Sequence, residues 1–321
     1  MPLPVPATTE NIRKAAELIR SGGLVAFPTE TVYGLGANAL DEAAVRAIFA
    51  AKGRPSTNPV IAHVANPEGA EAIAHVDVRA KRIMSALWPG PLTLVLPRKS
   101  IVPDIVTAGG ETVAVRMPRH PIALALLRDA CVPIAAPSAN RSESLSPTLA
   151  EHVYQSLGDS IAMILDGGPT EVGLESIVLD MTSIPARILR PGMADIDEIS
   201  SVLGEEIIAG SEQTGIAKSP GQMLRHYSPR TPLVLTKDLN ATAMQTTAPF
   251  AILAIGVDPQ IAQSIATIVL PDEPRAYASG LYAALHTLDA GGASTIMAQA
   301  PPASSEWSAI WDRLRRAASS N

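Results

Sequence analysis

Apolar runs alternate with polar breaks along the first part of the chain. Residues 11–20 repeat apolar positions at helical spacing and end at a Ser-Gly-Gly run, which predicts a helix. Residues 24–29 form a short apolar run that predicts a strand, followed by a loop over 29–38. Asp41 stands where a helix N-cap belongs, and residues 42–52 repeat apolar positions on one helix face.

Further short apolar runs predict more strands, with helical patterns between some of them. The predicted strands cover 59–64, 92–97, 112–118, 133–138, 162–167 and 176–181, and the predicted helices include 120–130 and 146–158. Several of these runs are apolar throughout, which is typical of strands that are covered on both faces. The pattern therefore predicts a mixed α/β sheet flanked by helices.

The chain changes character after residue 204. Residues 205–230 are polar, rich in Gly, Pro and Ser, and lack any sustained periodicity, so we expect a linker between domains. Beyond it, strand-like runs alternate with helical patterns, which predicts a small parallel α/β domain. These runs are 232–236, 250–256, 266–271 and 294–300, and the helical patterns are 278–292 and 305–319. The predicted division is 1–204, 205–230 and 231–321.

Composition narrows the possible functions. The 321 residues are 47% hydrophobic, enough for two packed domains. A net charge of -6 argues against a broad phosphate-gripping surface, and 3% aromatic residues leave few platforms for stacking bases. The single cysteine, Cys131, excludes an internal disulfide and a cysteine-rich zinc site. Because no run has the apolar length of a signal or a membrane span, we expect a cytoplasmic protein with no membrane contact.

Several segments are candidates for chemistry, although the residues alone leave their roles open. Lys52 and Arg54 end a predicted helix with a point charge and a planar fork, which suits polyphosphate oxygens but equally complements a helix dipole. Ser138 and Asn140 follow a predicted strand, where they could bind phosphate or ribose or form an ordinary turn. His63, inside an apolar run, is typical of a core histidine and has no partner at metal-ligand spacing.

Taken in order, the segments resemble the threonylcarbamoyl-AMP synthase family in its long form. The matching motifs are FPTETVYGLGANA, KGRPSTNPVIAHV, WPGPLTLVLP, ETVAVRMPRHP, APSANRSESLSPT, ILDGG, GLESIVLD and ILRPG, followed by the linker motif SPGQMLRHYSPRTP and the C-terminal motifs ASGLYAALHTLD and IWDRLRRAA. Each motif alone is weak, but their shared order covers nearly the whole chain.

This resemblance implies a fold and a reaction. The fold is a YrdC-like twisted, open mixed sheet with flanking helices, followed by a smaller Rossmann-like parallel α/β domain. The reaction joins L-threonine, bicarbonate or CO2, and ATP into threonylcarbamoyl-AMP with release of pyrophosphate, which makes the enzyme a nucleotidyltransferase. Mg2+ would accompany ATP with no metal site of the protein's own, and other proteins would transfer the threonylcarbamoyl group to an adenosine beside the tRNA anticodon. Contact with tRNA would be weak or indirect.

The resemblance also assigns roles to individual residues. The family's catalytic tetrad falls on Lys52, Arg54, Ser138 and Asn140, which would hold the phosphates. ATP contacts fall on Arg54, Asn58, Thr112, Ser138, Ser146, Arg190 and Tyr227. Threonine contacts fall on Thr31, His63, Arg116, Ala136 and Ser176, with Arg116 pairing with the amino-acid carboxylate. Residues 219–230 would fold over the cleft and place Tyr227 on the nucleotide.

Two departures and two alternatives accompany this interpretation. Ile177 stands where the family commonly has Thr, and the loop at 301–307 lacks the glycine that the family often has. Hydrogenase maturation factors contain a similar domain, but their cysteine-rich zinc motifs are incompatible with one cysteine. The remaining alternative is a non-catalytic RNA-binding module that uses the same basic cleft.

Overall fold

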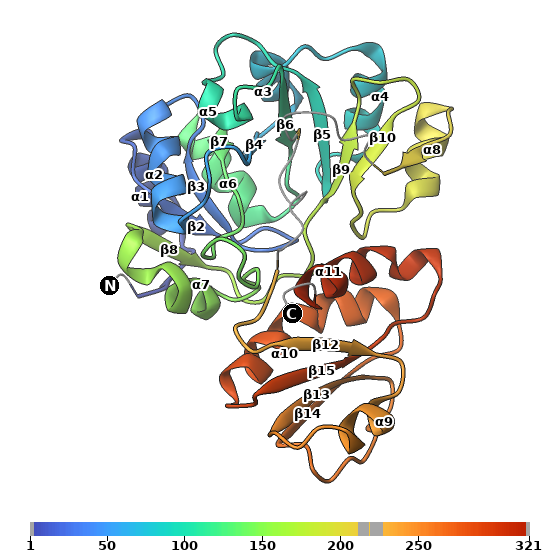
Figure 1. The fold of residues 1–321 in the computed structure, drawn as a ribbon. Coiled ribbons are helices and arrows are strands. Elements are labelled where there is room, and N and C mark those ends of the chain that lie inside the picture. The colour runs from blue at the N-terminus through green and yellow to red at the C-terminus, as the bar shows by residue number, and fades with distance from the viewer. Residues whose placement is uncertain (1–2, 211–217, 219–226, 319–321) are drawn as a thin grey trace.

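Two β-sheets organise the chain, and each belongs to one domain (Figure 1). The computed structural model describes residues 3–210, 218 and 227–318. Within that part of the chain, the first sheet has the strand order β1-β8-β2-β3-β7-β4-β6-β5-β9-β10-β11, and the second has the order β12-β15-β13-β14. The first sheet mixes parallel pairs with antiparallel ones, whereas all pairs of the second are parallel. The predicted fold class is confirmed.

The strands of the first sheet are short, and helices connect many of them. The strands are β1 (Val5–Pro6), β2 (Val25–Phe27), β3 (Gly34–Asn38), β4 (Ile61–His63), β5 (Leu92–Pro97), β6 (Thr112–Arg116), β7 (Ile134–Ala135), β8 (Met163–Asp166), β9 (Ile177–Asp180), β10 (Arg187–Arg190) and β11 (Ile208–Ala209). The helices are α1 (Thr9–Arg20), α2 (Glu42–Lys52), α3 (Pro67–Ile73), α4 (Val78–Leu87), α5 (Asp104–Thr107), α6 (Pro121–Ala130), α7 (Ala150–Leu157), the 3-10 turn η1 (Gly158–Ser160) and α8 (Ile196–Leu203).

Alternate residues of the strands pack on opposite faces of the first sheet. Val25 and Phe27 of β2 join an apolar cluster with α1 and α6, whereas Ala26 between them joins a cluster with α2. This alternation follows from the two-residue period of a strand. The predicted cap of α2 is confirmed, since the Asp41 carboxylate accepts hydrogen bonds from Ala43 N and Ala44 N.

The C-terminal domain has three layers. Its elements are β12 (Leu233–Thr236), α9 (Leu239–Met244), β13 (Phe250–Ile255), β14 (Ala266–Leu270), α10 (Pro274–Ala290), β15 (Thr295–Gln299), the 3-10 turn η2 (Ser305–Trp307) and α11 (Ser308–Ala318). Ala251 and Leu253 of β13 pack on the side of α10 and α11, and Phe250 and Ile252 pack on the side of α9. Helices α10 and α11 lie between the second sheet and the first domain (Figure 1).

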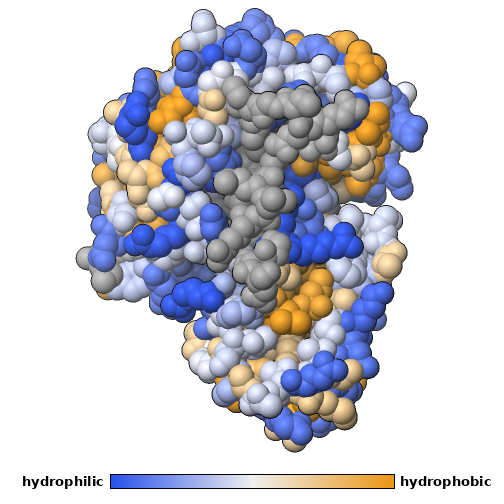
Figure 2. All heavy atoms as spheres, viewed as in Figure 1, coloured by the Kyte–Doolittle hydropathy of each residue, from blue (hydrophilic) through white to orange (hydrophobic). Residues whose placement is uncertain are grey.

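The domains meet through side chains of both. The His152 ring of α7 stacks on the His286 ring of α10, with 3.8 Å between ring centroids. Figure 2, from the same side as Figure 1, shows mainly hydrophilic residues on the outer surfaces and a notch at the right edge between the two domains. Among the helices of the described residues, none is long and apolar enough to cross a membrane.

The structure corrects two expectations from the sequence. Residues 34–38 form strand β3, antiparallel to β2, within the segment predicted as a loop. Gly36 is required in β3 because a Cβ at this position would lie 2.7 Å from Phe27 Cε1. The glycines of β3 contribute no apolar side chains, so the sequence lacked the pattern that predicts a strand. In addition, β11 pairs in parallel with β10, so the first sheet continues into the range predicted as linker. Most of the remaining linker, 211–217 and 219–226, lies outside the described residues.

Candidate active site

A cavity at one edge of the first sheet collects many of the predicted residues. It lies where β2, β4, β6, β7 and β10 end and where β9 begins. Its lining includes all the predicted threonine contacts and part of the predicted nucleotide contacts. The former are Thr31, His63, Arg116, Ala136 and Ser176, and the latter are Arg54, Ser138, Arg190 and Tyr227.

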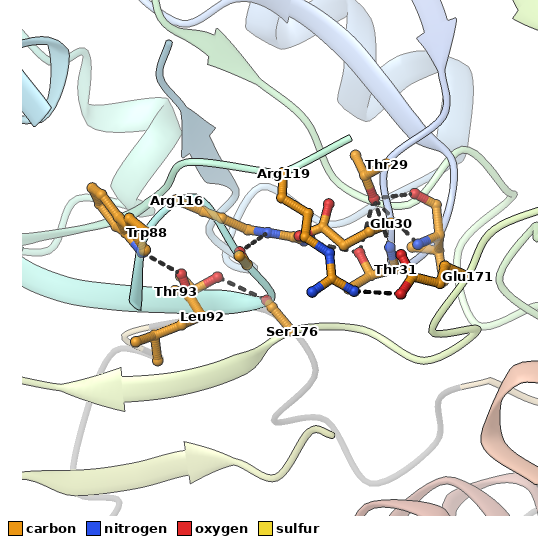
Figure 3. A network of polar contacts seen from close by, with 12 residues as sticks. Thr29, Glu30, Thr31, Trp88, Leu92, Thr93, Arg116, Arg119, Glu171 and Ser176 are labelled. Atoms are coloured by element: carbon orange, nitrogen blue, oxygen red, sulfur yellow. Dashed lines mark hydrogen bonds and ion pairs between the residues drawn. The ribbon is translucent and has the colours of Figure 1, made fainter. Parts of the chain in front are cut away.

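Arg116 is oriented by a chain of buried contacts (Figure 3). Its Nη2 lies 2.8 Å from Glu30 Oε1, and its Nη1 donates to Thr31 Oγ1 at 2.9 Å. Thr29 donates its hydroxyl to the Val32 carbonyl at 2.6 Å, so the 2.8 Å contact between the two threonine hydroxyls has Thr31 as its donor. The result is a fixed guanidinium beside a fixed hydroxyl, which suits an amino-acid carboxylate.

A second polar group joins β9 and β10 at the cavity. The Ser176 hydroxyl lies 2.7 Å from Thr93 Oγ1 and accepts a hydrogen bond from Arg190 Nη2 at 3.1 Å. Arg190 also donates to the Ser176 carbonyl from Nε and Nη2, at 3.1 and 2.9 Å. These contacts fix Arg190 against the cavity wall.

Lys52 and Arg54 flank the end of α2, where Gly53 adopts a left-handed conformation with φ of 61°. Lys52 Nζ donates to the carbonyl of Ser138 at 2.5 Å and to the carbonyl of Asn140. It therefore joins α2 to the loop after β7, which carries Ser138 and Asn140. Arg54 donates to the carbonyls of Asn58 and Pro59 at 3.1 and 2.8 Å.

Burial disfavours the charged forms of both cations. It lowers the pKa of Lys52 well below its usual value, and the positive charge of Arg54 lowers that pKa further. Burial also lowers the pKa of Arg54 to about 10. An anionic ligand beside these two side chains would stabilise their charged forms and so raise both pKa values again.

His63 is a buried, neutral imidazole on the cavity wall. Burial, assisted by the positive charge of Arg116, lowers its pKa to about 3. Its ring lies edge-on to Phe27, and its Nδ1 has no hydrogen-bond partner among the described residues. A neutral imidazole with an unpaired buried nitrogen can bind a polar atom of a ligand in the cavity.

Comparison with known proteins agrees with this geometry. Residues 17–192 match the Sua5/YciO/YrdC family model, described as "Telomere recombination", and residues 194–319 match the model of the threonylcarbamoyl-AMP synthase C-terminal domain. The Pyrococcus abyssi threonylcarbamoyl-AMP synthase is 43% identical, over 95% of this chain and 93% of its own length. The Bacillus subtilis protein of that name is 42% identical, over 96% and 92%.

A solved structure agrees over the whole length. The crystal structure of P. abyssi Sua5 complexed with L-threonine has a TM-score of 0.91 and 40% identity, covering 99% of this chain and 97% of that one. This chain belongs to the threonylcarbamoyl-AMP synthase family. A shorter Mycobacterium tuberculosis relative, 40% identical, aligns with 61% of this chain and 90% of its own length.

Several residues that the family resemblance assigns do not line the cavity. Lys52, Asn58 and Ser146 are buried and not part of its lining, Thr112 begins β6, and Asn140 donates from Nδ2 to the carbonyls of Arg141 and Ser144. Asn140 Oδ1 is buried without a hydrogen-bond partner among the described residues. Their roles toward a nucleotide stay predictions. Of the predicted cover at 219–230, residues 219–226 lie outside the described residues, whereas Tyr227 is described and lines the cavity.

The sequence analysis assigned no role to two buried carboxylates that hold other residues of the site in place. Glu30 pairs with Arg116, and Glu175 accepts hydrogen bonds from Ser146 and Arg313. Each immediately precedes a predicted threonine contact, Thr31 or Ser176. That adjacency was the available signal, but their partners are distant in sequence. Within the described ranges, no group of three or more His, Cys, Asp or Glu side chains could hold a metal ion.

Proposed function

We propose that this protein is an L-threonylcarbamoyladenylate synthase, a nucleotidyltransferase that joins L-threonine, CO2 from bicarbonate, and ATP. The observation that carries the proposal is that one cavity is lined both by Arg116 and Thr31 and by Arg54, Ser138 and Arg190. The first group suits an amino acid, and the second suits phosphate oxygens. The family relatives named threonylcarbamoyl-AMP synthase, and the P. abyssi Sua5 complex with L-threonine, support it.

On the amino-acid side, Arg116 would bind the threonine carboxylate. Glu30 keeps this guanidinium oriented, and Gly90 O accepts from its Nε at 3.3 Å. The neutral His63 and the Ser176 hydroxyl would face the remaining polar atoms of the amino acid. The cavity wall also includes Ile61 and Ala136, which could contact a methyl group.

On the nucleotide side, Arg54 and Arg190 would neutralise phosphate charge. Lys52 would act through the loop that it binds, since its Nζ already contacts the carbonyls of Ser138 and Asn140. Mg2+ would enter as part of the ATP substrate and be held mainly by phosphate oxygens and water. Binding of Mg2+ in this way requires no cluster of carboxylate ligands from the protein.

The chemistry requires positioning more than a covalent intermediate. The neutral amine of threonine forms a bond to the carbon of CO2 while one C–O π bond opens. The nitrogen then releases one of its two protons to solvent, and a carbamate results. A carbamate oxygen then forms a bond to the α-phosphorus while the bond from that phosphorus to the bridging oxygen breaks, releasing pyrophosphate. Holding both substrates in one cavity and neutralising developing charge are the main contributions of the residues.

We further propose that the product is passed to proteins that modify tRNA and that the protein acts in the cytoplasm. The product would be consumed by transfer of its threonylcarbamoyl group to an adenosine amine. With a net charge of -6, the chain would itself contact tRNA weakly or indirectly.

The test is pyrophosphate release by the full chain with ATP, Mg2+ and bicarbonate, in the presence of each amino acid in turn. We expect release that requires both L-threonine and bicarbonate, and that falls at least ~100-fold in Arg54→Met. Arg46→Met is the matched control, because Arg46 lies on α2, the helix that ends just before Arg54, and has a solvent-exposed side chain. Intact ATP with every amino acid, together with salt-sensitive tRNA binding, would instead favour the RNA-binding alternative.

A further inference from the structure

We propose that the C-terminal domain positions the nucleotide side of the candidate active site through Arg313 and Tyr282, which fix the orientation of Glu175. This inference rests on the proposed synthase function and assigns positioning residues outside the catalytic domain. It concerns side chains of α10 and α11 that contact the first domain.

Arg313 lies on α11 and contacts three parts of the chain at once. Its side chain is 1% exposed, and it is the largest fully buried side chain among the described residues. Nε donates to Glu175 Oε2 at 2.8 Å, and Nη2 donates to the Pro191 carbonyl at 3.1 Å. Its Cζ lies 5.0 Å from the centre of the Tyr227 ring, within range of a cation–π contact.

Glu175 is held by both domains. Oε1 accepts from Ser146 Oγ at 2.5 Å, and both carboxylate oxygens lie 3.3 Å from the Tyr282 hydroxyl of α10. Burial would raise the pKa of Glu175, but the positive charges of Arg313 and Arg190 outweigh that effect and lower it. Its carboxylate is thus ionised, and its oxygens accept from protein donors, so its role is to position neighbouring groups.

These contacts act on residues that line the cavity or lie beside it. Arg313 binds Glu175, which precedes the cavity residue Ser176 in the chain. It also binds the carbonyl of Pro191, which follows the cavity residue Arg190. Ser146 donates its only hydroxyl proton to Glu175, which leaves its oxygen as an acceptor. The arrangement therefore fixes the Ser146 hydroxyl against Glu175, which itself lines the cavity.

The loop that carries Glu175 is also packed tightly against α10. A Cβ at Gly173 would lie 2.5 Å from the Ala278 carbonyl oxygen, so the loop approaches the helix at a distance that only glycine permits. Leu174 is buried in the same apolar cluster as Leu281 and Leu285 of that helix. Packing against α10 of the C-terminal domain therefore helps to set the conformation of this loop.

Removing both partners of this pair should cost less activity than the two single losses combined. Loss of Arg313 leaves the Glu175 charge buried without its ion-pair partner, loss of Glu175 leaves Arg313 still paired with Asp312 at 2.7 Å, and loss of both removes both charges. A double-mutant cycle separates this coupling from general damage. The variants are Arg313→Met, Glu175→Gln and their combination.

The experiment measures kcat, the KM for ATP and the KM for threonine in the full chain, together with thermal unfolding. We expect Arg313→Met to raise the KM for ATP at least about tenfold, and the double variant to be at least about fivefold better than the product of the single losses. Arg315→Met is the matched control, since Arg315 is exposed on the same helix and stacks on Trp311. A purely structural role would shift the unfolding temperature and leave both KM values unchanged.

Tyr282→Phe is the second variant, in case Arg313→Met does not fold. It removes one donor to Glu175 and keeps the ring, so we expect a several-fold higher KM for ATP at an unfolding temperature close to wild type. Unchanged kinetics in Tyr282→Phe and in any folded Arg313→Met would overturn the inference, provided the wild type is active. An inactive wild type would instead count against the proposed function, and calorimetry with a non-hydrolysable ATP analogue then tests the positioning through binding alone.

Discussion

Arg116 and Glu30 form an ion pair of 2.8 Å in which both side chains are almost fully buried, at 4% and 1% exposure. Burial would raise the pKa of Glu30, but the nearby Arg116 outweighs that effect and lowers it. The two charges therefore stabilise each other in a site with little water. This pair sets the orientation of the guanidinium before any substrate arrives.

Replacing Glu30 with Gln should weaken both folding and threonine use. The substitution leaves Arg116 buried without its counter-charge, so we expect ~3 kcal/mol less unfolding free energy and a KM for threonine raised more than that for ATP. Chemical denaturation and steady-state pyrophosphate release measure the two effects. Glu171→Gln is the control, because Glu171 pairs with Arg119 at an exposed position. Equal stability in the two variants would contradict the prediction.

Replacing Lys52 with Met should disconnect α2 from the loop after β7. Two carbonyls, those of Ser138 and Asn140, would lose their donor inside the protein. We expect turnover to fall at least ~100-fold and affinity for an ATP analogue to fall with it, as measured by calorimetry. Lys14→Met, on the exposed face of α1, should leave both unchanged. Tight analogue binding by Lys52→Met would argue against this role of the loop.

Stability should fall on acidification because His63 is kept neutral. Its pKa is about 3 in the folded protein, lowered mainly by burial, against 6.5 ordinarily. The unfolded chain therefore gains a proton there as the pH drops below 6.5, and the folded chain does not until about pH 3. Protonation of His63 therefore costs no stability above pH 6.5. Below that pH, it reduces the free energy of unfolding by up to ~1.4 kcal/mol per pH unit.

Denaturation curves at pH 7.5, 6 and 5 test this slope. We expect His63→Gln to lose stability less steeply than the wild type over this range, because it has no imidazole to protonate. His75→Gln, at an exposed position, should keep the wild-type slope. Parallel slopes in all three proteins would show that His63 does not contribute.

Replacing Gly173 with Ala should separate steric conflict from backbone strain. Gly173 and Gly204 have similar φ values of 75° and 70°, but a Cβ at Gly204 would meet nothing within 4 Å. We expect Gly204→Ala to reduce the unfolding free energy by about 1–2 kcal/mol, and Gly173→Ala to reduce it by more than ~3 kcal/mol. Thermal and chemical unfolding give both values. Equal losses would mean that the loop can move away from α10.

The sequence predicted most strands with continuous apolar runs, and it predicted α2 together with its cap at Asp41. It did not predict β3, because Gly34 and Gly36 contribute no apolar side chains and the strand fits only by close approach to Phe27. The strands β1, β10 and β11 were also missed, since β1 and β11 have only two residues each and β10 is a four-residue strand with Arg at both ends. Hydrophobic patterning identifies longer runs that bury their own side chains, and these four strands do not have such runs.

The candidate site divides in a similar way. Motif resemblance named the residues that the structure gathers around one cavity, such as Thr31 and Arg116. It did not name their supports. Glu175 and Arg313 are separated by 138 residues, and no local pattern signals such a pairing. Motifs describe what faces the ligand, whereas the groups that hold those side chains are recognisable only from the folded arrangement.

The buried contact between Glu175 and Arg313 has a consequence for protein engineering. A chain reduced to the first domain would expose this carboxylate and the apolar surface around Leu174 to solvent. A chimera with a foreign C-terminal domain would need a cation in the same place. The two halves are therefore not interchangeable modules, and successful recombination between homologues would have to exchange both sides of the interface together.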